Sequence, residues 1–334
     1  MNKDSEWLVR KRMHGLYLSR KYNDDITSLS HELLGLHSWF YRNVPFSALI
    51  RGADISGWKT ALTKTWLYRG TLHGIPYSDL PRLLSLNTGH TYLESIFSKE
   101  MIESFANEVM RYMEDGVYSR KEFRQIFAES YEPKLIDTMF SPWGGIFVHL
   151  SRKGKAAFRD MTSRDFDLIS AEPTQSFDEV IPGLLQDFFR VYGPATIEDA
   201  MWFFGISLGS RKNSGKELQE LCNGNFNTRE IDKRLYYYCG DEETADIPKI
   251  TLLSGFDPIV VSYVNREAIL PAEYKSRVIL KSGICNPSIA VDGQITGIWN
   301  IKKNQSILEF FSPQPKNITT AAQEMVDLLR FQTQ

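Results

Sequence analysis

Apolar residues recur at helical spacing in three consecutive stretches of the chain, residues 1–96, 97–170 and 171–247. Each stretch predicts helices followed by a strand. From Ile250 onward apolar and polar residues alternate instead, which is typical of half-buried strands. The pattern therefore predicts an α+β protein of four parts, with three helical units of similar architecture and a C-terminal β domain over residues 248–334.

The stretch from Gly57 to Pro76 shows the unit most clearly. A short amphipathic helix with Lys59 and Lys64 is expected to lead into a β-branched and aromatic strand that carries Arg69. This order is typical of the recognition helix and wing of a winged-helix unit. The two lysines are candidate phosphate contacts. Arg69, expected on a strand face, either contacts DNA or forms an ion pair that holds the wing.

Hydroxyl and acidic residues mark where helices begin. The segment Thr27–Ser30 predicts a helix through residues 33–40, because its hydroxyls can accept bonds from the first backbone N–H groups. Ser119 and Glu122 have the spacing of a capping box. Thr196 follows the clearest break in the chain and is expected to cap the helix after it. Further helices are expected at residues 78–86, 98–112, 133–139, 211–225 and 318–331.

A second basic segment follows an expected strand at residues 146–150. Arg152, Lys153 and Lys155 are clustered on the predicted turn after it, so they are the preferred candidates for DNA contact. Near the C-terminus, Asp292-Gly293 lies between two alternating runs, which is a strong hairpin signal. We therefore expect a β-meander there.

Charge is uneven along the chain although the net formal charge is −2. Residues 1–165 hold 23 Lys and Arg against 19 Asp and Glu, a surplus of 4 positive charges, whereas the remainder holds 16 against 22. A basic N-terminal half permits a nucleic-acid surface, but a solvated face of mixed charge gives the same count.

The cysteines form no metal-binding pattern. Cys222, Cys239 and Cys285 include no Cys-x-x-Cys pair, so a reduced protein of the cytoplasm without a zinc site is expected. No leader peptide and no apolar run long enough to span a membrane are recognisable.

Four phrases of the sequence together resemble one family. They are Thr-Trp-Leu-Tyr-Arg-Gly-Thr-Leu-His at residues 65–73, Tyr-Gly-Pro-Ala-Thr at 192–196, Gly-Phe-Asp-Pro at 255–258, and Val-Asp-Gly at 291–293 with Gly297 and Trp299. They are similar to segments of the bacterial tandem winged-helix proteins that include the AlkZ-type DNA glycosylases. The resemblance spans nearly the whole chain in the same order.

The resemblance implies a fold and an activity. It implies three winged-helix units and a C-terminal β-barrel-like domain that together bind double-stranded DNA. It further implies hydrolysis of N-glycosidic bonds, which excises alkylated purines and unhooks interstrand crosslinks, with neither a metal nor an organic cofactor. A monomer is expected, because three unlike units in one chain do not suit a two-fold, palindrome-reading repressor.

The family's catalytic motif falls on His37-Ser38-Trp39 when the chain is aligned on Leu34-Gly35-Leu36. The family has Gln-x-Gln on a helix, with Gln-x-Asp and His-x-Gln as variants, so His37 is an accepted variant and Trp39 is a departure. A neutral His37 has one ring nitrogen that can accept a hydrogen bond from a water, whereas the Trp39 indole can only donate.

Other interpretations of the site stay open at this point. His37 is also a candidate core residue, and Trp39 a candidate packing residue. The chain could be a DNA glycosylase, a DNA or damage binder without catalysis such as a regulator, or a protein-interaction scaffold. Walker, Gly-x-Ser-x-Gly and His-Glu-x-x-His motifs are missing from the sequence.

Overall fold

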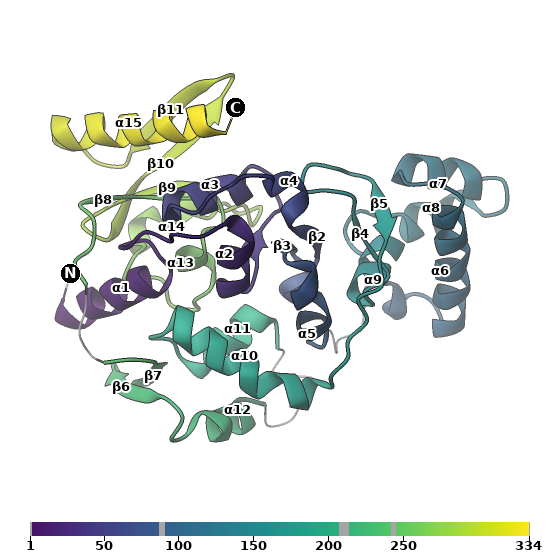
Figure 1. Ribbon diagram of the computed structural model, residues 1–334, viewed down its shortest axis with the longest axis horizontal. Coiled ribbons are helices and arrows are strands. Elements are labelled where there is room, and N and C mark those ends of the chain that lie inside the picture. Colours follow the sequence, from purple (N-terminus) through teal and green to yellow (C-terminus); the bar gives the residue numbers. More distant parts are fainter. Residues whose placement is uncertain (1, 87–90, 207–213, 242–244, 334) are drawn as a thin grey trace. The chain divides into compact units, whose positions relative to one another are not determined.

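The computed structural model describes residues 2–86, 91–206, 214–241 and 245–333. The chain divides into two compact units: unit 1 is Met1–Ser56 with Pro182–Gln334, and unit 2 is Gly57–Ile181 (Figure 1). This division is coarser than the four predicted segments, which remain a prediction. No helix among the described residues is both long and apolar enough to cross a membrane.

Unit 1 begins with three helices and a very short strand. They are α1 (Lys3–Gly15), α2 (Ile26–Glu32), β1 (Leu36–His37) and α3 (Asn43–Arg51). Asp25 caps α2 by accepting a hydrogen bond from the Ser28 N–H at 2.8 Å. The helix stops because Leu34 and Gly35 have φ values of +54° and +107°, which no right-handed helix allows. The predicted helix through residues 33–40 is therefore wrong, and His37 lies on β1.

The middle of unit 1 is helical with one β-hairpin. Its elements are α10 (Phe177–Tyr192), whose first turn still belongs to unit 2, α11 (Ile197–Phe204), α12 (Ser214–Cys222), β6 (Asn227–Ile231) and β7 (Arg234–Tyr238). The predicted cap is confirmed: Thr196 and Asp199 form a reciprocal capping box at α11. The helix expected at residues 211–225 corresponds to α12, and residues 211–213 lie outside the described part of the chain.

The C-terminal part of unit 1 is an antiparallel sheet covered by a helix (Figure 1). The strands β8 (Ile250–Leu253), β9 (Ser288–Val291), β10 (Gln294–Lys302) and β11 (Gln305–Phe310) lie in the order β11-β10-β9-β8. The short helices α13 (Pro258–Val261), η4 (Ala272–Tyr274) and α14 (Lys275–Val278) connect β8 to β9, and α15 (Lys316–Gln332) follows β11.

The predicted hairpin between β9 and β10 is confirmed. Val291 pairs with Gln294, and Asp292 and Gly293 have φ values of +49° and +78°, as a two-residue type I′ turn requires. The core beneath this sheet contains Phe46 from α3, Trp299 from β10 and Val326 from α15. Burial of apolar area between helix and sheet therefore joins the two ends of the chain in one core.

Unit 2 combines helices with strands drawn from distant parts of its sequence. Its elements are α4 (Trp58–Ala61), β2 (Thr63–Trp66), η1 (Tyr68–Gly70), β3 (Leu72–Ile75), η2 (Tyr77–Asp79), α5 (Leu80–Leu84), η3 (Leu93–Ser95), α6 (Lys99–Glu114), α7 (Arg120–Phe127), α8 (Pro133–Met139), α9 (Ile146–Arg152), β4 (Ala156–Phe158) and β5 (Phe166–Leu168). Strands β3, β2, β4 and β5 lie side by side in that order. The sheet thus joins segments on both sides of residue 96.

Several local predictions in unit 2 are confirmed. The Ser119–Glu122 capping box starts α7, and α8 covers the predicted residues. The helix expected at residues 78–86 is confirmed by α5, and that expected at 98–112 by α6.

Two other local predictions are wrong. Residues 146–150 belong to helix α9 and not to a strand, because a short apolar run does not by itself distinguish a buried strand from a buried helix. The expected single strand at residues 65–73 is a hairpin of β2 and β3, in which Arg69 occupies the turn with φ +58°.

The observed architecture confirms an α+β protein with antiparallel sheets. The number of winged-helix units and a barrel-like closure of the C-terminal domain stay predictions.

Candidate active site

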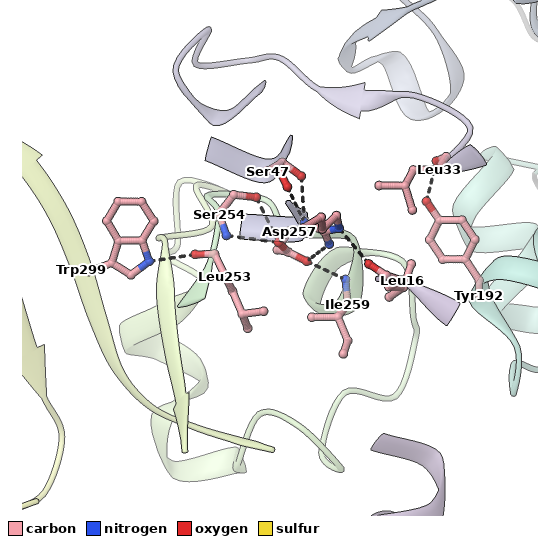
Figure 2. A network of polar contacts seen from close by, with 10 residues as sticks. Leu16, Leu33, Ser47, Tyr192, Leu253, Ser254, Asp257, Ile259 and Trp299 are labelled. Carbon is pink, nitrogen blue, oxygen red and sulfur yellow. Dashed lines mark hydrogen bonds and ion pairs between the residues drawn. The ribbon is translucent and has the colours of Figure 1, made fainter. Parts of the chain in front are cut away.

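The segment that leads to His37 is anchored at the end of α2. The Tyr192 hydroxyl donates a hydrogen bond to the Leu33 carbonyl at 2.6 Å (Figure 2), and the Tyr263 hydroxyl donates to the Tyr192 carbonyl at 2.8 Å. Tyr192 and Tyr263 are both fully buried. Because a buried hydroxyl left without a partner is costly, these bonds fix where α2 ends and β1 begins.

The His37 ring stacks on the ring of Phe256. The two ring centroids are 4.1 Å apart and the ring planes differ by 2°. Phe40 lies at a tilted angle to Phe256, with a centroid distance of 6.2 Å, and its own side chain is 46% exposed. His37 is half-buried. It is therefore held from one side by an aromatic ring from a segment more than 200 residues away in the sequence.

Phe256 has a strained backbone. Its φ of +56° is in the left-handed region, which costs a residue with a side chain about 1 kcal/mol or more. Its N–H donates to the Cys285 carbonyl at 3.2 Å. Cys285 itself is buried, and burial raises the pKa of its thiol to about 12, so the sulfur stays protonated at neutral pH.

Asp257 holds the loop that carries Phe256. Its carboxylate accepts hydrogen bonds from the Ser254 N–H and hydroxyl at 3.1 Å each, and from the Ile259 N–H at 3.3 Å (Figure 2). Arg51 at the end of α3 donates to both carboxylate oxygens, at 2.9 and 3.2 Å. The ion pair is wholly enclosed, since both side chains are 0% exposed.

Arg51 has partners for its remaining donors. Its Nε donates to the Leu16 carbonyl at 2.9 Å, and its Nη1 donates to the carbonyl and hydroxyl of Ser47 at 3.1 and 3.0 Å. A buried charge is tolerated only when it is paired and hydrogen-bonded, as here. The result is a rigid connection from α1 and α3 to the Phe256 loop.

Gly255 completes this loop for a steric reason. A Cβ at position 255 would lie 2.7 Å from the Asn43 side-chain oxygen, so any larger residue would require the Asn43 side chain to shift. Asn43 is buried, and its amide nitrogen has no hydrogen-bond partner within the part of the chain that the structure describes.

Hydrogen bonding restricts the chemistry of His37. The Trp39 backbone N–H donates to His37 Nδ1 at 3.4 Å. A neutral His37 in this arrangement carries its proton on Nε2, which then donates and does not accept. Trp39 is half-buried, and its indole is likewise donor-only. Next to it Ser38 is fully buried, with a hydroxyl that has no partner among the described residues.

The predicted DNA contacts of residues 57–76 lie at three different kinds of position. Lys59 is exposed on α4, and Arg69 is half-buried in the turn between β2 and β3. Lys64 lies on β2, not on a helix, and is 7% exposed. Its ammonium donates to the carbonyls of Met161 and Ser163 at 3.3 and 3.2 Å, and burial lowers its pKa.

The basic cluster at residues 152–155 stays together, at the end of α9 and the turn after it. All three side chains are half-buried. Lys153 forms an ion pair with Glu103, and Lys155 forms one with Glu172. Partly exposed pairs of this kind contribute at most about 1 kcal/mol, so a phosphate group could replace the carboxylate at little cost.

Comparison with known proteins decides the family. The sequence model of the AlkZ-like DNA glycosylase family matches residues 59–327, which is well over half of the chain. The chain belongs to the AlkZ-like DNA glycosylase family. The matched residues begin after His37, so the role of His37 stays a prediction.

Two comparisons extend over most of this AlkZ-like chain. It is 25% identical over 304 residues to an interstrand DNA cross-link repair glycosylase of Streptomyces sahachiroi, covering 81% of this chain and 77% of that protein. The solved structure of the Streptomyces sahachiroi DNA glycosylase AlkZ shares the fold with a TM-score of 0.79 at 21% identity, covering 99% of this chain and 97% of the other.

Sequence reasoning on this AlkZ-like protein missed the residues that surround His37. The sequence segments that resemble the family include Tyr192, Phe256 and Asp257, but the sequence assigned none of them a role at the site. The sequence held one signal for Asp257: an aspartate directly before a proline is a typical helix N-cap. If such an aspartate is buried, a buried cation such as Arg51 has to balance its charge. Arg51, by contrast, had no distinguishing pattern around it.

Proposed function

We propose that this protein is a DNA glycosylase that hydrolyses the N-glycosidic bond of alkylated purines in double-stranded DNA and unhooks interstrand crosslinks. Membership of the AlkZ-like DNA glycosylase family over residues 59–327 carries the proposal. The similar protein of Streptomyces sahachiroi, an interstrand DNA cross-link repair glycosylase, supports the crosslink substrate.

The chemistry required is modest, because an N-alkylated purine already carries positive charge and leaves without a general acid. The enzyme then has to hold a water and stabilise a sugar with oxocarbenium character. His37 holds that water in our proposal. To accept its proton, His37 gives up the Trp39 N–H contact, which at 3.4 Å is long and is worth about 1 kcal/mol or less.

Trp39 takes the position of the family's second glutamine but does a different task. An indole N–H cannot accept a hydrogen bond from the water. The half-buried ring is suited instead to packing beside the base or the sugar.

The proposal assigns DNA contact to basic residues of unit 2. Lys59, Arg69, Arg152, Lys153 and Lys155 are exposed or half-buried, and they bind phosphates in this proposal. Lys64 is left out, because its ammonium is committed to two carbonyl groups inside the unit. Three winged-helix units and a barrel-like C-terminal domain are the framework we propose for this surface.

We further propose that the protein acts as a monomer in the cytoplasm, without metal or cofactor. Its cysteines Cys222, Cys239 and Cys285 are free thiols in the structure, which suits a reducing compartment.

The decisive experiment incubates the protein with duplexes that carry N7-methylguanine, N3-methyladenine or an interstrand crosslink, and measures abasic sites. Base release from at least one substrate is the expected result. Tight binding with no release from any of them would refute the glycosylase.

A binder of damaged DNA without catalysis is the second candidate function. One observation favours it. While His37 Nδ1 accepts from the Trp39 backbone N–H, the other ring nitrogen of His37 and the Trp39 indole can only donate, so neither side chain can accept a hydrogen bond from a water. Such a protein would bind lesion-containing duplexes more tightly than undamaged ones and would leave the glycosidic bond intact.

A further inference from the structure

We propose that Phe256 is a positioning residue for His37, and that the buried Arg51–Asp257 pair exists to hold Phe256 in that position. The inference rests on the proposed function, in which His37 holds the attacking water. It adds a device that brings a residue from the C-terminal half of the sequence to the candidate catalytic histidine.

The geometry of the two rings is the first argument. The rings are parallel to within 2° with centroids 4.1 Å apart, so rotation of the His37 ring about its χ2 torsion would break the stack. A histidine that has to aim one nitrogen at a water needs its ring plane fixed. Phe256 supplies that constraint from one face, and the Tyr192–Leu33 hydrogen bond fixes the backbone before it.

The backbone of Phe256 is the second argument. Simple burial of a phenylalanine does not require a left-handed backbone, and Phe256 is only half-buried in spite of its φ of +56°. An unfavourable conformation persists only where neighbouring groups enforce it, and such positions cluster at functional sites.

The groups that enforce it are identifiable. Asp257 accepts five hydrogen bonds, two from Arg51, two from Ser254 and one from Ile259. Gly255 on the other side of Phe256 packs closely against the Asn43 side chain, whose oxygen would lie 2.7 Å from a Cβ at this position. The residues on both sides of Phe256 are thus held, which fixes its backbone in the conformation that places its ring against His37.

The first test is spectroscopic and independent of catalysis. The protein is labelled with ¹³C at the histidine Cε1 atoms, and the His37 signal is identified among the 6 histidines by its loss in His37→Gln. A ring stacked on a phenyl face gives an upfield proton signal. We expect this shift in the native protein, its loss in Phe256→Leu and its return in Phe256→Tyr. Phe311→Leu, a half-buried phenylalanine of the same unit that packs on Tyr274, is the control and leaves the signal in place.

The second test measures single-turnover base release. A misplaced catalytic group costs about ten-fold or more in rate, so Phe256→Leu should fall by that factor while Phe256→Tyr and Phe311→Leu stay near the native rate. Affinity for DNA should be unchanged in all three, because Phe256 is not among the proposed phosphate contacts.

A third variant excludes misfolding as the explanation. Phe256→Gly removes the ring but suits a φ of +56°, so the loop keeps its conformation. It should fold like the native protein and reproduce the spectral and kinetic losses of Phe256→Leu.

The outcomes separate this inference from the function on which it rests. An unmoved His37 signal in Phe256→Leu and Phe256→Gly, with normal base release, overturns the positioning role while the glycosylase stands. A signal that moves and returns as expected, in a protein that releases no base, supports the positioning role and refutes the glycosylase.

Discussion

The Arg51–Asp257 ion pair gives the sharpest quantitative prediction, because each partner can be removed while the other stays buried. We consider Arg51→Met, Asp257→Asn and the double variant. Removing one partner of a buried pair costs about 3–5 kcal/mol, since an uncompensated charge remains. In Arg51→Met the Asp257 carboxylate keeps its bonds from Ser254 and Ile259. In Asp257→Asn the guanidinium keeps the carbonyl of Leu16 and both oxygens of Ser47.

Because these bonds remain, we expect each single variant to lose about 3 kcal/mol of stability, near the lower limit of that range. The double variant leaves no unpaired charge, so its cost should be smaller than the sum of the single costs by about 2 kcal/mol. A surface pair of the same unit is the matched control: Arg277 and Glu309 are 39% and 56% exposed. Arg277→Met should therefore cost less than about 1 kcal/mol.

Hydrogen exchange measured by mass spectrometry on peptides over residues 250–262 is the appropriate assay, because it reports the opening of this loop and does not require the two-unit chain to unfold in one step. A loss of 3 kcal/mol accelerates exchange about 100-fold where opening is in fast equilibrium. Single variants that exchange less than about five-fold faster, or a double variant whose cost equals the sum, would refute the stated role of the pair.

Four further outcomes are expected. His37→Ala should lower single-turnover base release about 100-fold or more without weakening DNA binding, and an unchanged rate would remove His37 from the mechanism. DNA affinity should fall with salt at a log–log slope of about −4 to −5, for roughly five phosphate contacts, whereas a flat response would contradict the DNA surface. Ser119→Ala should destabilise unit 2 by about 1 kcal/mol in urea titrations through loss of the α7 cap, with Ser130→Ala as a control outside any cap. Burial, followed by the charge of Lys153, lowers the pKa of His149 below its usual 6.5, so the unfolded chain binds the extra proton and thermal stability should decline as pH falls below that value. His149→Gln should weaken that decline, and an identical pH profile in this variant would contradict the assignment.

Local signals in the sequence were sufficient where one short segment decides its own structure. The capping box at Ser119, the helix cap at Thr196 and the Asp292-Gly293 turn are confirmed, because a side chain and a backbone group a few residues apart satisfy each other. The family, too, was evident from short phrases such as Thr-Trp-Leu-Tyr-Arg-Gly-Thr-Leu-His.

Predictions from short segments were wrong where groups far away in the sequence determine the local structure. Periodicity predicted a helix through residues 33–40, but α2 ends at Glu32. The buried Tyr192 hydroxyl donates to the carbonyl of the C-cap residue Leu33, and Leu34 turns left-handed. Lys64 looked like an exposed phosphate contact. It is instead enclosed, because carbonyl groups about 100 residues away need a donor inside the unit.

The sequence by itself thus determined the α+β class, the positions of most helices and the family. It located the candidate catalytic motif at His37 and Trp39 but could not say what surrounds them. Only the tertiary structure brought Phe256 onto His37 and joined Arg51 to Asp257. The physical reason is that caps and turns are satisfied within a few residues, whereas a buried charge or a strained backbone is stabilised by whichever distant group the fold brings to it.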